Sequence, residues 1–206
     1  MVASEKMTLE DGYIDVAPGK LAAVVTSLEM LTPAAQRPVP ELAGVSVRAI
    51  ESPEASWYRD LCARVGAEEW LWFSRLKLST GGLEAIIQHP KVEICALTVD
   101  GRDEGLLELD FRVDGECELA FFGVTARCIG RGAGRLLMNA AIEHAWSHPI
   151  TRFWVHTCTL DHPGALQFYV RSGFRPYRRQ IEIADDPRLS GLIRETAAPH
   201  VPIIRP

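Results

Sequence analysis

The chain has 206 residues, of which 47% are hydrophobic and 24% are charged. This length permits one sizeable hydrophobic core but is short for two, so we expect a single domain. The formal net charge of −5 provides no basic surface for nucleic acid or for an anionic membrane, and neither is expected as a partner.

The cysteines and the N-terminus predict a cytoplasmic location. The five cysteines form no C-x-x-C pair and are odd in number, which favours reduced thiols over a disulfide framework. Residues 1–11 are too polar for a signal peptide, and no apolar run reaches the ~18 residues that a membrane span needs.

The N-terminal region, residues 1–42, is expected to form an arm and a proline-rich linker that pack on the main domain, residues 43–206. Residues 13–31 contain β-rich segments around a Pro18-Gly19 turn. Residues 32–42 carry three prolines, which is typical of a linker.

The next part of the chain is predicted to be a strand followed by helices. Residues 45–50 alternate between apolar and polar side chains, as a half-buried strand does. A helical stretch is expected over residues 53–78, opened by the Ser52-Pro53 pair and broken near Gly66. Residues 81–88 are predicted to form another short helix.

From residue 91 onward the pattern predicts strands and then alternating helices and strands. Asp-Gly pairs separate three strand-like runs and favour tight hairpin turns between them. The last predicted helix has Asp161 or His162 as its cap and ends at Gly173. In chain order we expect strands at 92–99, 105–113 and 117–124, a helix at 131–147, a strand at 152–159, a helix at 163–172 and a strand at 175–184.

A glycine-rich loop is the most informative feature of the chain. Residues 124–135 read V-T-A-R-C-I-G-R-G-A-G-R, a strand exit followed by glycines at three alternate positions and then by a helix start. Glycines let the backbone approach a ligand closely, and the free N–H groups of a helix start attract anions. Arg131 and Arg135 add full positive charges. The loop is therefore predicted to bind phosphate.

The spacing within this loop excludes two common phosphate sites. A dinucleotide fingerprint needs Gly or Ala where Arg135 stands, and an acidic residue about 20 positions on, where residues 149–155 carry none. A Walker loop needs Gly-Lys followed by Ser or Thr, which is absent. The pyrophosphate of coenzyme A is the remaining common ligand.

Two motifs stand in order between residues 118 and 174. The first is I-G-R-G-A-G at residues 129–134, and the second is H-x-x-A-x-x-x-Y from His162 to Tyr169, followed by Gly-Phe. Together they resemble the GNAT superfamily of acetyl-CoA-dependent N-acetyltransferases, whose motifs read Arg/Gln-x-x-Gly-x-Gly/Ala and Asn-x-x-Ala-x-x-x-Tyr. Ile129 and His162 are the two departures from that pattern.

The resemblance implies an α/β fold of the mixed α+β GNAT-like type, with a central, mostly antiparallel sheet splayed at the acyl-CoA site and helices on both faces. The N-terminal arm would be an addition to that fold. Acetyl-CoA is implied as the co-substrate, and no metal is expected. The residues assigned to acetyl-CoA are Phe122, Gly123, Val124, Ile129, Gly130, Arg131, Gly132, Ala133, Gly134, Arg135 and His162.

Acyl transfer from a thioester to an amine needs a base for the amine and a proton donor for the departing thiolate. The resemblance implies Tyr169 as general acid and Glu118, on the strand before the loop, as base. A core tyrosine and a solvated carboxylate are the alternative interpretations. Strand alternation predicts that Glu118 shares a face with Ala120, Phe122 and Val124. Water is another candidate for the base, as are two other carboxylates, Glu108 and Asp110.

The acceptor is expected to be the primary amine of a small molecule. Trp57, Trp70 and Trp72, with Tyr58 and Phe73 nearby, are candidates for lining its pocket, because aromatic faces attract apolar groups and cations. Core packing explains the same aromatics equally well. The sequence does not choose between a small amine, a peptide N-terminus and a lysine side chain.

Five side chains resemble other kinds of site. His144 and His148 have a metal-binding spacing, but a third ligand is not evident, so a surface pair is expected. A nucleophile system of His156 and Cys158 with Asp161 has no supporting signature. Two further hypotheses concern the whole chain: a non-catalytic acyl-CoA sensor, and a homodimer formed through the strand of the N-terminal arm.

Overall fold

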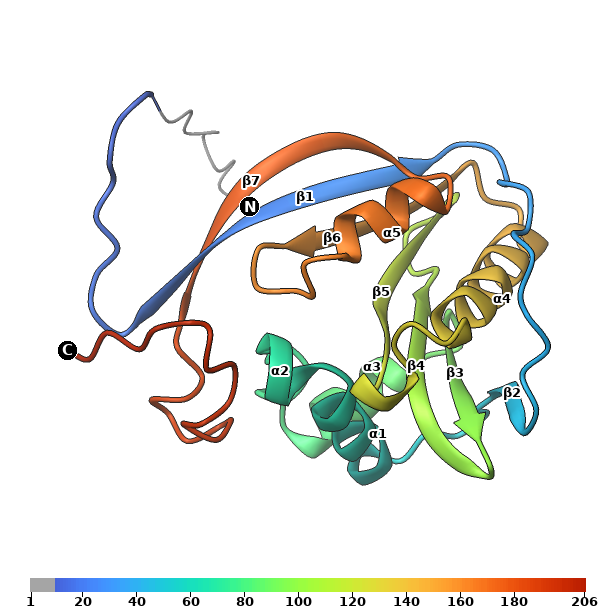
Figure 1. Cartoon of the computed structure of the whole chain (residues 1–206), viewed down its shortest axis with the longest axis horizontal. Helices are drawn as coiled ribbons and strands as arrows, with labels where there is room; N and C mark the ends of the chain where they lie inside the picture. Colours follow the sequence, from blue (N-terminus) through green and yellow to red (C-terminus); the bar gives the residue numbers. More distant parts are fainter. Residues whose placement is uncertain (1–9) are drawn as a thin grey trace.

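The computed structural model describes residues 10–206, so the first nine residues of the polar N-terminus and of the predicted arm lie outside it. The described chain forms one seven-stranded sheet in the order β2-β3-β4-β5-β6-β1-β7, with helices on both faces (Figure 1). The strands are β1 Lys20–Met30, β2 Val45–Ala49, β3 Val92–Val99, β4 Arg102–Asp110, β5 Glu116–Val124, β6 Arg152–Cys158 and β7 Arg175–Asp185. The predicted mixed fold with a mostly antiparallel sheet is confirmed.

Strands β3, β4 and β5 form the antiparallel meander that the Asp-Gly turns predicted. Asp100 and Gly101 have φ of 50° and 80°, the left-handed pair that a tight hairpin turn requires. The β4–β5 pairing contains a bulge, because Glu108 pairs with Phe121 and Leu109 pairs with Leu119. Ala120 is therefore an extra residue in β5, and the side-chain alternation changes there.

Strands β5 and β6 are parallel, and they pair over only three residues. The paired positions on β5 run from Glu116 to Glu118, and beyond them the two strands separate. Helix α4 Ala133–Ser147 makes the crossover between these strands, and helix α5 Ala165–Arg171 follows β6. The predicted splay of the sheet is therefore present.

The helices bury two separate faces of the sheet. Helices α4 and α5 pack on one face through side chains such as Leu137 and Met138. Helices α1 Ala55–Cys62 and α3 Thr80–Ile87 pack on the other face, where Leu61 and Leu83 are fully buried.

The predicted helix over residues 53–78 is shorter and more irregular than expected. Helix α1 is followed by a π-helical turn at Ala63–Ala67 and by the three-residue helix α2 Glu68–Trp70. The chain leaves the helix at Leu71, whose φ is 56°. Gly66 explains the irregularity, since a Cβ there would stand 2.0 Å from the ring of Trp72. The predicted break near Gly66 is thus confirmed, whereas the entry of the Trp72 ring into the turn was not predicted.

Strand β1 occupies an unexpected position. It follows the Pro18-Gly19 turn as one long strand and lies inside the sheet, between β6 and β7 (Figure 1). From Val25 to Glu29 both of its edges are paired within the chain. This part of the arm therefore has no edge for pairing with a second subunit. The division of the chain at residue 42 stays a prediction.

The C-terminal residues 186–206 have no regular structure but are anchored. Arg188 is buried, pairs with Asp186 at 2.7 Å, and donates to the carbonyl oxygens of Ala197, Ala198 and Val201. Ile193 and Ala198 pack against Leu71. This segment thereby supports the chain that forms one wall of the cavity described below.

Candidate active site

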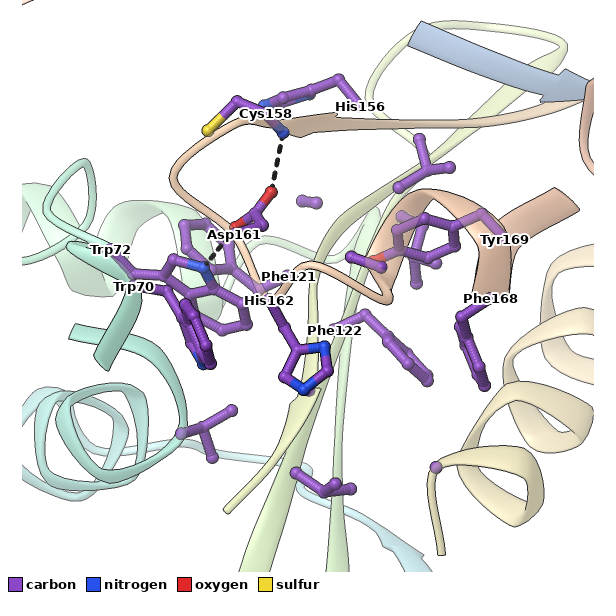
Figure 2. Close-up of a pocket in the computed structure, with 18 of the residues that line it drawn as sticks. Trp70, Trp72, Phe121, Phe122, His156, Cys158, Asp161, His162, Phe168 and Tyr169 are labelled. Carbon is purple, nitrogen blue, oxygen red and sulfur yellow. Dashed lines mark hydrogen bonds between the residues drawn. The ribbon is translucent and has the colours of Figure 1, made fainter. Parts of the chain in front are cut away.

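A cavity of about 680 Å³ opens where β5 and β6 separate. Figure 2 shows its aromatic and polar lining, contributed by α2, β5, β6 and α5. Most of the residues that the sequence analysis singled out line it: Trp70, Trp72, Glu118, Phe122, Gly123, Val124, Ile129, Gly130, Gly132, Gly134, Arg135, His162 and Tyr169. Arg131, Ala133 and Trp57 are not among the lining residues.

The glycine loop presents a row of free backbone amides to this cavity. Gly130 and Gly132 have φ of 77° and 90°, so the chain reaches the start of α4 through left-handed conformations. Within residues 10–206, no amide from Gly130 to Gly134 donates a hydrogen bond. Five free N–H groups at the start of a long helix fit a diphosphate, because the helix dipole adds positive potential there.

The proline-rich linker lies against this loop and against α4. The main chain of Arg37 exchanges hydrogen bonds with the amide of Asn139. The guanidinium of Arg135 donates to the carbonyl oxygen of Pro38 at 3.0 Å. Arg37 and Arg171 line the cavity beside Arg135, so two further arginines lie near the loop. The sequence analysis missed both, and Arg37 is 102 residues before the Asn139 that it contacts.

Replacing Gly132 with Ala is expected to weaken acetyl-CoA binding about tenfold. An alanine in this left-handed conformation is strained by about 1–2 kcal/mol, and about 1.4 kcal/mol is tenfold in affinity. Its Cβ would also lie 3.0 Å from Cγ of Pro40. Calorimetric titration measures the change, and Gly81→Ala, where a Cβ meets nothing within 4 Å, is the matched control. Equal affinities for both variants would contradict the proposed loop contact.

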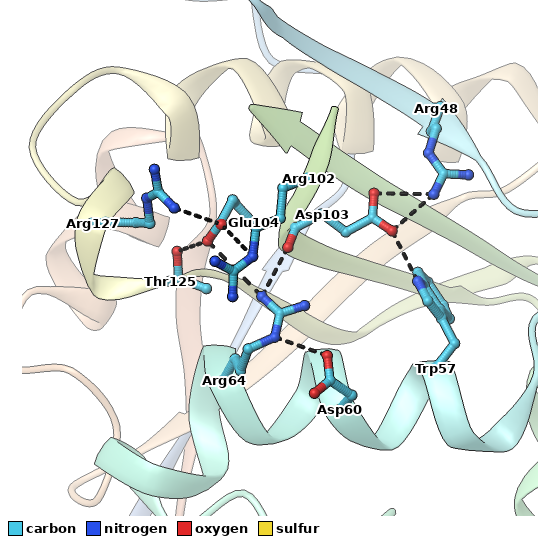
Figure 3. A network of polar contacts seen from close by, with 9 residues as sticks. All are labelled: Arg48, Trp57, Asp60, Arg64, Arg102, Asp103, Glu104, Thr125 and Arg127. Atoms are coloured by element: carbon cyan, nitrogen blue, oxygen red, sulfur yellow. Dashed lines mark hydrogen bonds and ion pairs between the residues drawn. The ribbon is translucent and has the colours of Figure 1, made fainter. Parts of the chain in front are cut away.

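A buried carboxylate fixes the start of the loop (Figure 3). Glu104 is 1% exposed and accepts a hydrogen bond of 2.6 Å from the hydroxyl of Thr125. It also pairs with Arg127 at 3.1 Å and with Arg102 at 3.2 Å, while Arg64 of the π-helical turn lies 3.9 Å away. The network thus joins β4, the loop and the turn beneath Trp72, and it holds the loop in place through charge-assisted bonds.

Tyr169 lies on α5, across the cavity from Trp70 and Trp72 (Figure 2). Figure 2 shows its hydroxyl directed toward the centre of the cavity. Its ring packs edge-on against Phe122 and Phe174. Within residues 10–206 the hydroxyl makes no hydrogen bond, and burial, with the nearby Asp161, raises the pKa of Tyr169. The hydroxyl therefore stays protonated and is free to donate to a ligand.

Glu118 does not share a face with Phe122 and Val124, contrary to the alternation that the sequence predicted. The side chains of Cys117, Leu119 and Phe122 pack into the same core, on the side of α4. The extra residue at Ala120 reverses the alternation, so Glu118 faces the side of α1 and α3. Its carboxylate lies 3.5 Å from Nδ1 of His156 on β6.

Asp161 and His162 do not cap α5 through their side chains as predicted; Gly164 is the N-cap residue. Asp161 instead accepts from the indole of Trp72 at 2.9 Å and from the amide of Cys158 at 2.8 Å (Figure 2). Nδ1 of His162 accepts from the amide of Gly164, and its ring lies 5.1 Å from that of Trp70. These contacts connect the end of β6 to the wall of the cavity.

Of the remaining aromatic and acidic candidates, Phe73 lines the cavity, and the others are engaged by neighbouring side chains. Trp57 donates to Asp103 at 2.9 Å, as Figure 3 shows. Glu108 is fully buried, accepts from the hydroxyl of Tyr58, and pairs with Arg75 at 2.6 Å. Asp110 lines the cavity, but its carboxylate is bound by Arg112.

Cys158 is expected to react slowly with alkylating agents at neutral pH. Burial, with the nearby Asp161, raises the pKa of its thiol to about 11, so little thiolate is present at pH 7. Mass spectrometry after brief iodoacetamide treatment measures the labelled fraction. Rapid labelling of Cys158 would contradict this expectation and revive the nucleophile hypothesis.

His144 and His148 both contact Glu93 on β3, at 3.4 and 2.8 Å. Between residues 10 and 206, no group of three or more His, Cys, Asp or Glu side chains is arranged to hold a metal ion. None of the helices in that part of the chain has the length and hydrophobicity that a bilayer crossing demands.

Comparison with solved structures finds the same fold. A GCN5-related N-acetyltransferase from Sphaerobacter thermophilus superimposes with a TM-score of 0.61 at 11% identity, covering 80% of this chain and 52% of that one. A GCN5-related N-acetyltransferase from Kribbella flavida superimposes with a TM-score of 0.55 at 19% identity, covering 84% of this chain and 63% of that one. A tandem GNAT protein from the clavulanic acid biosynthesis pathway superimposes with a TM-score of 0.58 at 18% identity, covering 79% of this chain and 53% of that one.

This chain thus spans between 52% and 63% of the length of these three structures. Among curated proteins compared by sequence, none matches it. The model of the acetyltransferase (GNAT) family matches residues 64–174, more than half of the chain, and includes the glycine loop and Tyr169. With the splayed sheet and the loop in agreement, the chain belongs to the GNAT family of acetyltransferases.

Proposed function

We propose that this protein transfers an acetyl group from acetyl-CoA to the primary amine of a small molecule. The observation that carries the proposal is the row of free amides from Gly130 to Gly134, which opens into the cavity that also holds the hydroxyl of Tyr169. A diphosphate at the loop would direct the attached pantetheine arm along β5, at Phe122, Gly123 and Val124. Beyond Glu118 the edge of β5 that faces β6 is unpaired and offers backbone groups to that arm.

The proposed reaction needs a base for the acceptor and a proton donor for the leaving sulfur. The ammonium of the acceptor loses a proton to a base, with Glu118 or water in that role, and the neutral amine attacks the thioester carbon. The new C–N bond forms, the C–S bond breaks, and Tyr169 gives its proton to the leaving sulfur. The nitrogen loses its second proton to solvent, and solvent restores the proton of Tyr169.

The aromatic wall beside the reacting groups supports a small acceptor with an apolar or cationic part. Trp70, Trp72 and Phe121 line the cavity opposite Tyr169 (Figure 2). Glu118 faces the same side as Phe121 and adds a negative charge there. An ammonium group is attracted both by that charge and by the ring faces.

A thiol-release assay tests the proposal. Purified protein is incubated with acetyl-CoA and with spermidine, tryptamine, kanamycin or short peptides that present an N-terminus or a lysine. We expect release of free CoA with one of the small amines. Release with peptides alone would favour the peptide N-acetyltransferase alternative, and tight acetyl-CoA binding with no release at all would favour the sensor. Longer acyl-CoAs belong in the same assay, because acyl chain length is open.

We also propose a cytoplasmic location. The observation that all five cysteines are free thiols supports it. Four of them are buried, and burial raises the pKa of the Cys117 thiol in particular. Fractionation of cells that express the full chain tests this, and recovery outside the cytoplasm would contradict it.

A further inference from the structure

Resting on the proposed function, we propose that His156 takes the proton from the acceptor's ammonium at its Nε2, and that Glu118 acts through His156 as a positioning residue. One feature of the geometry favours His156 over Glu118 as the group that takes the proton directly. The Glu118 carboxylate lies 3.5 Å from Nδ1 of His156, and the other ring nitrogen of His156 is left for the acceptor.

The position of the pair follows from the sheet. Strands β5 and β6 are last paired at Glu118 and Trp154, and beyond that point they separate. His156 is two residues after Trp154 and on the same face, so it is the first side chain of β6 at the opening. Glu118 is the last side chain of β5 before the opening. The two meet at 3.5 Å, from Oε1 to Nδ1, and both line the cavity.

The contacts of the ring determine which nitrogen faces the acceptor. Nδ1 faces Glu118, and within residues 10–206 Nε2 has no hydrogen-bond partner. Half of the His156 side chain is exposed, which gives a ligand access to it. A carboxylate that holds Nδ1–H fixes the tautomer in which Nε2 carries the lone pair. Nε2 is then ready to accept a proton.

Three carboxylates act on His156, while Arg75, whose charge interacts with that of Glu118, lines the same cavity. The carboxylates are Glu118 on β5, Asp161 in the loop before α5, and Glu182 on β7. Asp161 is already engaged by Trp72, Thr157 and Cys158. The three carboxylates, with Glu118 contributing most, raise the pKa of His156 above its ordinary value. A stronger base is better suited to removing a proton from an ammonium.

In the proposed step, a proton passes from the ammonium nitrogen to Nε2 of His156, and the freed lone pair attacks the thioester carbon. The imidazolium is stabilised by Glu118 and later releases its proton to solvent. The C–S bond then breaks as before, with Tyr169 supplying the proton to sulfur.

The kinetic test compares the chain with its His156→Gln and His148→Gln variants, using the amine from the panel that supports the fastest CoA release. For the unaltered chain we expect kcat to rise with pH through the raised pKa of His156. In His156→Gln we expect kcat to be about 100-fold lower and this rise with pH to be absent. His148→Gln, which alters a surface histidine of the same type, keeps both. Using one amine throughout makes its own ionisation common to all three proteins.

A second measurement is independent of any acceptor. The ring nitrogens of His156 are followed by NMR during a pH titration, with His156→Gln identifying their signals. We expect the pKa of His156 to lie above its ordinary value and to fall in Glu118→Gln. An unchanged pKa in Glu118→Gln would overturn the pairing. An active wild type whose His156→Gln variant keeps its rate and its rise with pH would overturn the inference alone, whereas no CoA release from the wild type with any amine overturns the proposed function.

Discussion

Tyr169→Phe is expected to lower kcat for amine acetylation by about 100-fold, the lower end of what general acid catalysis contributes. The variant removes one oxygen that makes no hydrogen bond within residues 10–206, and the ring keeps its packing against Phe122 and Phe174. Acetyl-CoA affinity and the melting temperature should therefore stay close to those of the wild type. Steady-state thiol release, calorimetry and thermal unfolding measure the three quantities.

Tyr177→Phe is the matched control for this variant. Tyr177 lies on β7, is 43% exposed, and stacks on Arg152 at 4.7 Å, away from the cavity lining. Loss of the hydroxyl there should leave kcat unchanged. If Tyr169→Phe also keeps full kcat, Tyr169 is a core tyrosine and the leaving thiolate obtains its proton elsewhere. If the wild type and Tyr169→Phe both bind acetyl-CoA but neither releases CoA, the result would favour the non-catalytic sensor hypothesis.

The parts of the site that the sequence predicted are those encoded locally. The alternate glycines at 130, 132 and 134 determine the backbone conformation of their own loop, and the Asp100-Gly101 pair determines its own hairpin turn. The second motif brings Tyr169 to α5 because residues 162–174 form one turn and one helix. Neither result depends on a distant part of the chain.

The parts that the sequence did not predict depend on contacts between distant residues. The bulge at Ala120 is visible only in the pairing of β5 with β4, and it moves Glu118 to the other face of the sheet. The π-helical turn at Gly66 depends on the ring of Trp72, which is tied in turn to Asp161, 89 residues further on. Strand alternation and helical periodicity, which describe one element at a time, carry no information about such contacts.

Strand β1 illustrates the same limit at the level of topology. Its apolar residues predicted a strand, but its place between β6 and β7 depends on pairing with residues 153–158 and 175–185. The linker that follows β1 is thereby carried to α4, where Arg37 reaches the cavity. A position next to the glycine loop is thus determined by a strand at the far end of the sequence.

Glu108→Gln is expected to destabilise the protein by about 3 kcal/mol, because removing one partner of a buried ion pair leaves the other charge uncompensated. Glu108 is 0% exposed and is held by the hydroxyl of Tyr58 and by Arg75 at 2.6 Å. For a chain of this size the melting temperature should fall by roughly 6–12 °C. Burial is the largest cause that raises the pKa of Tyr58, and burial persists in the variant, so the hydroxyl is not expected to ionise and compensate Arg75.

The effect should extend to the cavity, since Arg75 lies over the ring of Phe121 at 5.1 Å and lines the acceptor side. Glu108→Gln is therefore expected to raise KM for the amine more than it weakens acetyl-CoA binding, which we propose takes place at the glycine loop. Asp114→Asn is the control, because its pair with Lys91 is 92% exposed on the acidic side, where solvent screens the attraction. Similar melting temperatures for the two variants would mean that the charge of Arg75 is compensated without Glu108, and the ion pair would then not be what holds the wall of the cavity together.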